Sequence, residues 1–305
     1  VAREHLAAAG YDQVQVLCAD GGYGYPEGAP YDRIVLTVGA WDISPAWWEQ
    51  LAPGGRLVLP LELPGGQRSV AFQRRGQELV STSIKPCGFM PLQGDFAPPQ
   101  PTRVQIGSDP NLCLSFGGER ELPISADHFA GWLSEPGQDW ATGVTTTMGE
   151  IGGSFFPWMG VQWPQGDETT ALPAGLSARG DLADQGVMPA LYGFGGEHKS
   201  MHTFVLIEAD GGAAMMRPPG QTPPLIDVNH PPDDPPAFEL YVRQLGPGTD
   251  AAQHLVERIQ DWDRAGRPKR RCRQIRALPA EMAYTPAEGE LLLDEKGTKL
   301  VISYQ

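Results

Sequence analysis

The residues best suited to chemistry are an acid and a glycine that follow a short alternating segment. Residues 13–17 alternate in polarity as a half-buried strand does, and the loop Ala19-Asp20-Gly21-Gly22 comes directly after them. A carboxylate at the carboxyl end of a strand can accept a hydrogen bond from an exocyclic amine. A glycine beside it lets a flat ring approach the backbone. Asp20 and Gly21 are therefore candidate ligand-binding residues, with a plain Asp-Gly turn as the alternative interpretation.

A strand, a helix and a second strand follow and would position these residues. The apolar, β-branched run 33–38 is typical of a buried parallel strand. Residues 44–51 begin with the helix-start pair Ser44-Pro45, and residues 56–61 form another buried strand. Strand–helix–strand at these lengths is a βαβ crossover, so we expect a parallel sheet covered on both faces.

Further candidates lead out of the run 33–38 toward the same edge of the sheet. Thr37, Gly39 and Ala40 end this strand, and the small side chains keep a crevice open, although tight helix–sheet packing explains them equally well. Trp41 follows at the strand tip, where it could line a peptide groove or pack in the core. No acid–base pair stands out among these residues.

Residues 11–61 also resemble a known family. ADGGYGYPEGAPYDRIVLTVGAWDI, followed by EQLAPGGRLVLPL, is similar to the second half of a protein-L-isoaspartate O-methyltransferase. That family shows a GDG-x-x-G loop, an APYD-x-I strand entry, a Thr-x-x-Ala strand exit and a QL-x-x-GG-x-L-x-x-P turn, in this order and at this spacing. The similarity is greatest to a long actinobacterial type with GAWDI, AWW and CGF-x-P-x-QG signatures and a C-terminal extension.

The resemblance implies an S-adenosyl-L-methionine-dependent enzyme that methylates an isoaspartyl or aspartyl carboxylate of a protein or peptide, for protein repair or for modification of a ribosomal peptide. It implies that Asp20 and Gly21 contact the adenine, with Thr37 and Gln93 also on the cofactor side; Gln93 stands where the family more often has Thr. Residues 39–41 would then lie on the acceptor side. No catalytic side chain is required, because a carboxylate is ionised at pH 7 and in-line methyl transfer depends on orientation.

The domain organisation follows from the same comparison and from the prolines. Residues 1–98 are expected to be a partial methyltransferase domain, the second half of a doubly wound, Rossmann-like α/β sheet. Residues 99–305, after the linker APPQP, would form an α+β C-terminal domain for substrate recognition or structure. The chain opens with a helix, whereas a doubly wound nucleotide domain begins with a strand, a Gly-rich turn and a helix. We therefore expect the N-terminal half of the first domain to be missing and this chain alone to be inactive.

The composition excludes several classes of protein. A net charge of −14 argues against nucleic-acid binding, and no apolar run is long enough for a membrane span. Four scattered cysteines without a C-x-x-C pattern suit a reducing cytoplasm. His198 and His202 lack a third ligand nearby, so no metal is expected. A non-catalytic peptide-binding remnant and a small-molecule O-methyltransferase remain alternative functions.

Overall fold

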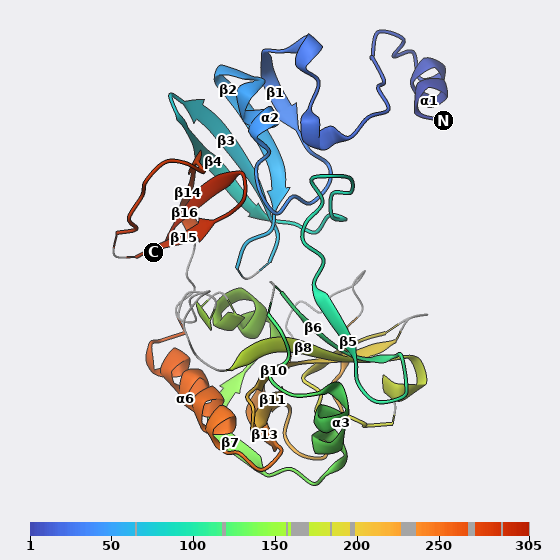
Figure 1. The fold of residues 1–305 in the computed structure, drawn as a ribbon, viewed down its shortest axis with the longest axis vertical. Helices are drawn as coiled ribbons and strands as arrows, with labels where there is room; N and C mark the ends of the chain where they lie inside the picture. The colour runs from blue at the N-terminus through green and yellow to red at the C-terminus, as the bar shows by residue number, and fades with distance from the viewer. Residues whose placement is uncertain are drawn as a thin grey trace. The chain divides into compact units, whose positions relative to one another are not determined.

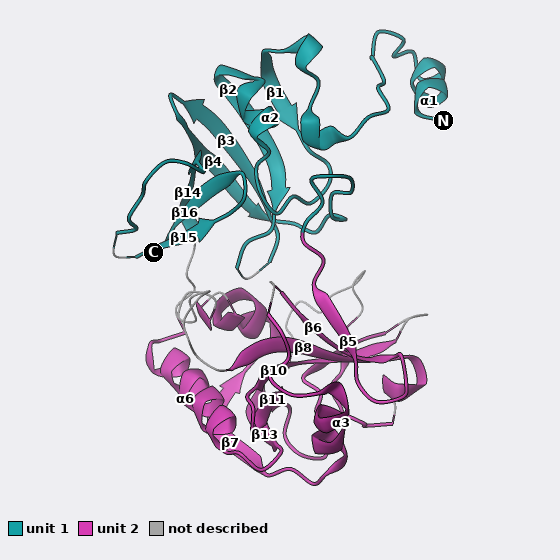
Figure 2. Ribbon diagram, viewed as in Figure 1, with its two compact units in different colours: residues 1–98, 271–305 teal, residues 99–270 magenta. Residues whose placement is uncertain are grey.

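The computed structural model describes residues 1–64, 66–117, 120–156, 158–159, 171–183, 185–195, 199–226, 236–267, 272–287 and 289–304. The chain divides into two compact units, coloured separately in Figure 2. The first comprises residues 1–98 and 271–305, and the second comprises residues 99–270. Our expectation of a single C-terminal domain over 99–305 is therefore wrong for its last segment, which returns to the first unit.

The first unit is a mixed α/β structure with one sheet (Figure 1). Among its described residues, the strand order is β1-β2-β3-β4-β14-β16-β15, with β1 and β2 parallel and every other pair antiparallel. The elements are α1 (Ala2–Ala8), β1 (Tyr31–Val35), α2 (Pro45–Glu49), β2 (Leu51–Leu61), β3 (Arg68–Arg75), β4 (Glu78–Pro86), β14 (Cys272–Pro279), β15 (Glu290–Asp294) and β16 (Thr298–Tyr304).

The C-terminal segment returns because β4 would otherwise be an edge strand. Backbone N–H and C=O groups need partners, and β14 supplies them by pairing Arg276 with Val80 and Ala277 with Leu79. Strands β16 and β15 then extend the sheet. Sequence patterns cannot indicate such a pairing, because its partners are far apart along the chain.

The predicted crossover is confirmed as β1–α2–β2. Ser44 caps α2 by accepting a hydrogen bond from the backbone N–H of Ala46 over 3.2 Å, and Pro45 stands in the first turn. Strand β2 begins earlier than expected, at Leu51, and residues 53–55 form an irregularity within it. The strand pairing shifts at this irregularity, because residue 31 of β1 pairs with residue 51 of β2 whereas residue 33 pairs with residue 56.

The strand predicted over residues 13–17 is wrong. These residues are irregular and mostly exposed, and α1 before them buries none of its residues. Figure 1 shows α1 apart from the sheet, at the end of a long connecting segment. A strand is stable only when a neighbour takes its hydrogen bonds, and no strand of the described chain pairs with residues 13–17.

The second unit is an α+β structure built on an antiparallel sheet. Its described main path is β5-β6-β8-β10-β11-β13-β7, with β9 pairing β10 and β12. One face of this sheet packs against α6 in one hydrophobic cluster, and the other face packs against α3 in a second cluster. The elements are β5 (Thr102–Gln105), β6 (Leu112–Phe116), α3 (Ala126–Ser134), β7 (Asp139–Thr146), α4 (Met148–Glu150), β8 (Leu172–Arg179), β9 (Tyr192–Phe194), β10 (Ser200–Ile207), β11 (Gly212–Met216), β12 (Leu225–Ile226), β13 (Phe238–Leu245) and α6 (Asp250–Arg264).

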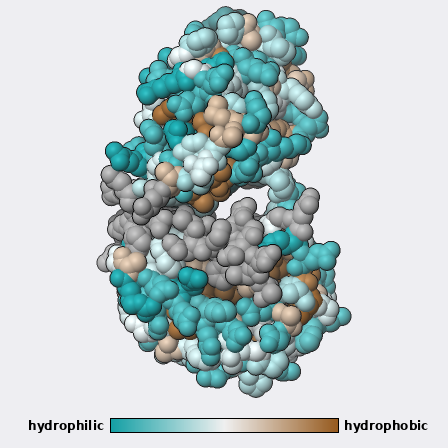
Figure 3. Space-filling model, turned by 60° about the vertical axis from the view of Figure 1, so that its left-hand side comes forward, coloured by the Kyte–Doolittle hydropathy of each residue, from teal (hydrophilic) through white to brown (hydrophobic). Residues whose placement is uncertain are grey.

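Helices α3 and α6 differ in their N-terminal caps. Ser125 caps α3 by accepting from the backbone N–H of His128 over 3.2 Å, whereas Thr249 makes no side-chain cap on α6. His198 lies outside the described residues. No described helix is long and apolar enough to cross a membrane. Figure 3 shows mostly hydrophilic residues on the described surface in that view, with small hydrophobic areas among them.

Candidate functional site

Asp20 opens a short loop, residues 20–25, which we call the Asp20 loop. One carboxylate oxygen accepts a hydrogen bond from the backbone N–H of Gly22 over 2.8 Å, and the other from that of Asp95 over 2.7 Å. The second contact ties the loop to residues 90–96, which we call the crossing segment. These donors, that of Asp95 above all, hold the pKa of Asp20 below its ordinary value. The carboxylate is therefore ionised at neutral pH.

The crossing segment approaches Asp20 closely because residue 94 is a glycine. Gly94 has φ +100°, and a Cβ at this position would lie 2.2 Å from Oδ2 of Asp20. The Tyr23 hydroxyl adds a second tie by donating to Oδ2 of Asp95 over 2.7 Å, which raises the pKa of Tyr23. A side chain at position 94 would push the segment off the carboxylate.

Helix α2 holds the Asp20 loop through three side chains. The Ser44 hydroxyl donates to the carbonyl oxygen of Gly22, and the Trp47 indole donates to that of Gly21, each over 2.7 Å. Gln50 donates to and accepts from the loop backbone over 2.9 and 2.8 Å. The sequence analysis did not identify the polar role of any of the three. The one available signal was a set of hydrogen-bonding side chains on the helix after the strand exit.

Gly39 and Ala40 are buried between two stretches of backbone. Gly39 donates to the carbonyl oxygen of Met90 and accepts from the N–H of Leu92, each over 2.7 Å, and Ala40 bonds in the same way to the end of β2. A Cβ on Gly39 would lie 2.3 Å from Nε2 of Gln67. At these positions the geometry shows tight packing rather than an open crevice.

Trp41 and Trp47 hold the end of the crossing segment between them. Trp41 stacks on Phe96 with ring centroids 5.8 Å apart, and its indole N–H donates to the Phe96 carbonyl oxygen over 3.2 Å. Trp47 meets the same ring edge-on at 5.3 Å. Trp41 is half-buried, so part of its surface stays accessible beside the Asp20 loop.

The structure therefore brings together most, but not all, of the predicted site residues. Five of them lie near the crossing segment. Hydrogen bonds to this segment, or to the side chains that hold it, are made by Asp20, Gly21, Gly39 and Trp41, and Ala40 lies beside them. Thr37 and Gln93 are exposed, and their side chains make no hydrogen bond within the described residues. Gln93 does belong to the crossing segment, next to Gly94.

A buried acid that sequence reasoning missed lies next to Trp41. Asp42 is fully buried and accepts hydrogen bonds from the Ile43 N–H over 2.7 Å, the Gly297 N–H over 2.5 Å and the Thr298 hydroxyl over 2.6 Å. Burial raises the pKa of Asp42 despite these donors. Asp42 therefore ties the exit of β1 to the returning C-terminal hairpin.

The open part of the site is at Gly21. This glycine is exposed, and a Cβ placed on it meets no atom within 4 Å. A flat ring can therefore approach its backbone, and each Asp20 oxygen keeps a lone pair for a further donor. These residues fit the adenine end of a nucleoside ligand. Within the described ranges, no group of three or more His, Cys, Asp and Glu side chains could hold a metal ion.

Comparisons with known proteins concern the same region. Residues 1–97 match the family model of protein-L-isoaspartate(D-aspartate) O-methyltransferase. A protein-L-isoaspartate O-methyltransferase of Hyperthermus butylicus is 43% identical over 101 residues, which are 31% of this chain and 40% of that protein. One of Ignicoccus hospitalis is 41% identical over 92 residues, or 30% of this chain and 44% of that protein. The chain thus spans less than half the length of these relatives.

A solved structure of a protein-L-isoaspartate O-methyltransferase aligns with this chain, and the alignment covers 99% of this chain and 63% of the chain in that structure. The sequence identity is 15% and the TM-score is 0.32. The similarity of this chain to these proteins is one of sequence and lies within residues 1–97.

Proposed function

We propose that the protein transfers a methyl group from S-adenosyl-L-methionine to a carboxylate, because residues 1–97 match the protein-L-isoaspartate(D-aspartate) O-methyltransferase family model and are similar to proteins of that name. The acceptor would be an isoaspartyl or aspartyl side chain of a protein or peptide. The observation that carries the proposal is the pairing of an ionised Asp20 with an open Gly21 in the matched region.

Asp20 and Gly21 would bind the adenine end of the cofactor. Asp20 accepts a hydrogen bond from the exocyclic amine, while the ring lies against the Gly21 backbone. Ser44, Trp47 and Gln50 act as positioning residues, because they fix the loop from α2. Trp41, half-buried on Phe96, would line the acceptor side.

The reaction needs no general base from the protein. When bound, the cofactor would supply an activated methyl group. The acceptor carboxylate is already ionised at neutral pH, so the protein has to orient it and exclude water. A methyl ester and S-adenosylhomocysteine are the products. The four free thiols support a reducing cytoplasm as the setting.

The sharpest test of cofactor placement is Gly21→Val. A Cβ at position 21 meets no atom of the chain within 4 Å, so we expect the variant to fold, while its side chain occupies the space assigned to adenine. Overfilling a packed site costs roughly 1–3 kcal/mol, and we expect S-adenosylhomocysteine to bind the natural protein more weakly by about that amount in calorimetric titration.

Gly117→Val is the matched control for this experiment. Gly117 is also exposed, and a Cβ added to it would meet no atom within 4 Å, but it lies in the second unit. Affinity should be unchanged in this variant. Equal affinity of Gly21→Val and the wild type would remove the Asp20 loop from the cofactor site. Failure of the wild type to bind at all would favour a non-catalytic protein.

A further inference from the structure

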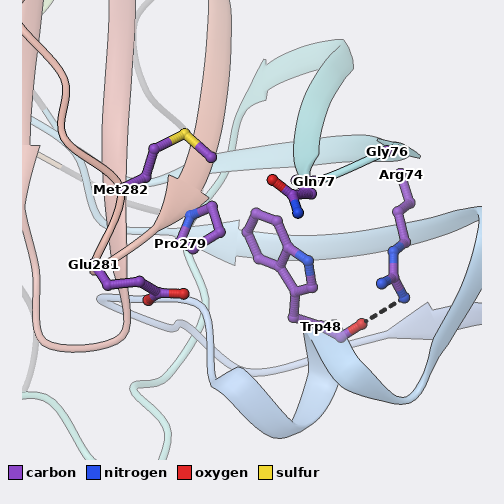
Figure 4. A pocket seen from close by; sticks show the side chains of 7 residues that line it. All are labelled: Trp48, Arg74, Gly76, Gln77, Pro279, Glu281 and Met282. Carbon is purple, nitrogen blue, oxygen red and sulfur yellow. Dashed lines mark hydrogen bonds between the residues drawn. The ribbon is translucent and has the colours of Figure 1, made fainter.

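A pocket of about 260 Å³ lies in the first unit, where the β3–β4 turn meets α2 and the segment after β14 (Figure 4). Part of its wall comes from residues 279–282, which lie outside the region matched by the family model. The pocket therefore depends on the C-terminal return. The side chains that matter here are Trp48, Arg74, Gln77, Pro279, Glu281 and Met282.

Arg74 fixes one end of the pocket. Its Nη1 donates to the carbonyl oxygen of Trp48 over 3.0 Å and also to that of Leu51. Both bonds use a single nitrogen, and the structure shows no partner for Nε or Nη2 among the described residues. Arg74 thus keeps donors for a ligand oxygen, and in the view of Figure 4 the Gln77 amide lies near the Trp48 indole.

The other end of the pocket suits a cation. In the view of Figure 4, the Trp48 indole lies between Arg74 and Glu281, with Pro279 and Met282 on the Glu281 side. A cation over the face of a tryptophan is attracted by the ring, and the exposed Glu281 carboxylate adds an opposite charge. The net charge of −14 draws cationic partners toward the molecule as a whole.

We propose that this pocket binds the basic side chain of a peptide, either lysine or arginine. The cationic head rests on Trp48 and pairs with Glu281, the aliphatic stem packs on Pro279 and Met282, and Arg74 donates to a peptide carbonyl oxygen. The volume is below the range of about 300–1,000 Å³ typical of whole small-molecule ligands, which suits one side chain presented by a longer chain. This site stands whether or not the protein transfers methyl groups.

The test is a titration of the 305-residue chain with acetyl-Gly-X-Gly-amide peptides, followed through the indole N–H resonances. Trp48→Phe assigns the Trp48 resonance. We expect a saturable shift of that resonance when X is arginine or lysine. Glu281→Gln should weaken binding about two- to fivefold, as for a partly exposed ion pair.

Controls separate this result from charge or shape alone. Glu49→Gln removes an equal charge next to Trp48 in sequence but outside the pocket lining, and it should leave the affinity unchanged. Norleucine at X keeps the stem without the charge and should not bind. The proposal is overturned if the norleucine peptide binds as well, if a glutamate peptide shifts the resonance through Arg74, if Glu281→Gln and Glu49→Gln behave alike, or if no peptide shifts it.

Discussion

The two units differ in how much apolar surface they leave exposed. In the second unit, hydrophobic clusters with α6 and α3 cover both faces of the sheet, and Leu225 is its one exposed large hydrophobic residue among those described. In the first unit the exposed large hydrophobic residues are Val1, Tyr11, Val14, Leu17, Tyr23, Val35, Phe89 and Met90. The unit that carries the family motifs is therefore the less closed of the two.

This difference shows where the first unit gains its order. Its N-terminal residues lack packing, yet the Asp20 loop is fixed by side chains from α2 and by the crossing segment. Hydrogen bonds between distant segments, rather than a local strand, position the candidate site. The second unit depends instead on continuous burial. The predictions below test this contrast.

The largest expected effects come from emptying each core. Phe72 in the first unit and Trp262 in the second are both fully buried. Replacing either with alanine should cost about 3–5 kcal/mol of unfolding free energy. We expect each variant to lower the transition of its own unit, as measured by hydrogen exchange in increasing denaturant. If either variant lowered the unfolding free energy of both units equally, the two units would unfold as one cooperative structure, and the contrast between them would be wrong.

A matched pair of hydroxyl deletions sharpens the contrast in hydrogen bonding. Thr298 donates to the Asp42 carboxylate over 2.6 Å in the first unit, and Ser134 donates to the Ala130 carbonyl oxygen over 3.0 Å in the second. A bond to a charged group is worth roughly 1.5–3 kcal/mol and a neutral one about 0.5–1.5 kcal/mol. Thr298→Val should therefore destabilise more than Ser134→Ala in denaturant unfolding. The reverse order would show that Asp42 is protonated or poorly bonded.

The smallest effect is a pH dependence of stability that arises from two acids of the first unit. Burial raises the pKa of Asp42 above its ordinary value of 3.8, and Glu295 has a pKa raised by its own burial and by the Asp42 charge. As pH rises, these two acids therefore lose their protons at a higher pH in the folded state than in the unfolded state. Their contribution to stability is fully present below the ordinary values and is lost as pH rises through the raised pKa values.

Asp42→Asn removes the titration of Asp42 and its charge next to Glu295. The stability of the wild type should fall relative to this variant as pH rises from 3.8 through the raised pKa of Asp42, measured by thermal unfolding at a series of pH values. A wild type that gains stability over the same range would mean that the three hydrogen bonds outweigh burial and lower the pKa.

Local chemistry made much of the fold predictable, and non-local pairing explains what was missed. The Ser44-Pro45 start of α2 was predictable because its cause lies within a few residues. The strand over residues 13–17 failed because alternation gives no hydrogen-bond partner. The return of β14 and the bonds of Asp42 to residues 297 and 298 join positions more than 190 residues apart, which no local pattern encodes.

The candidate site shows the same division. Asp20 and Gly21 could be proposed from the sequence because an acid and a glycine at a loop start have a recognisable chemistry. Ser44 and Gln50 were missed because their function depends on which loop α2 faces. Gly39 proved to be packed by Gln67, a contact between residues that share no pattern.

The most direct test of the proposed function is methyl transfer by the natural protein from methyl-labelled S-adenosyl-L-methionine to a peptide with one isoaspartyl residue. The same peptide with asparagine at that position is the control for the acceptor carboxylate. We predict a base-labile methyl ester on the isoaspartyl peptide alone, reduced by Gly21→Val and unchanged by Gly117→Val. Cofactor binding without an ester on either peptide would contradict the account and indicate a different acceptor.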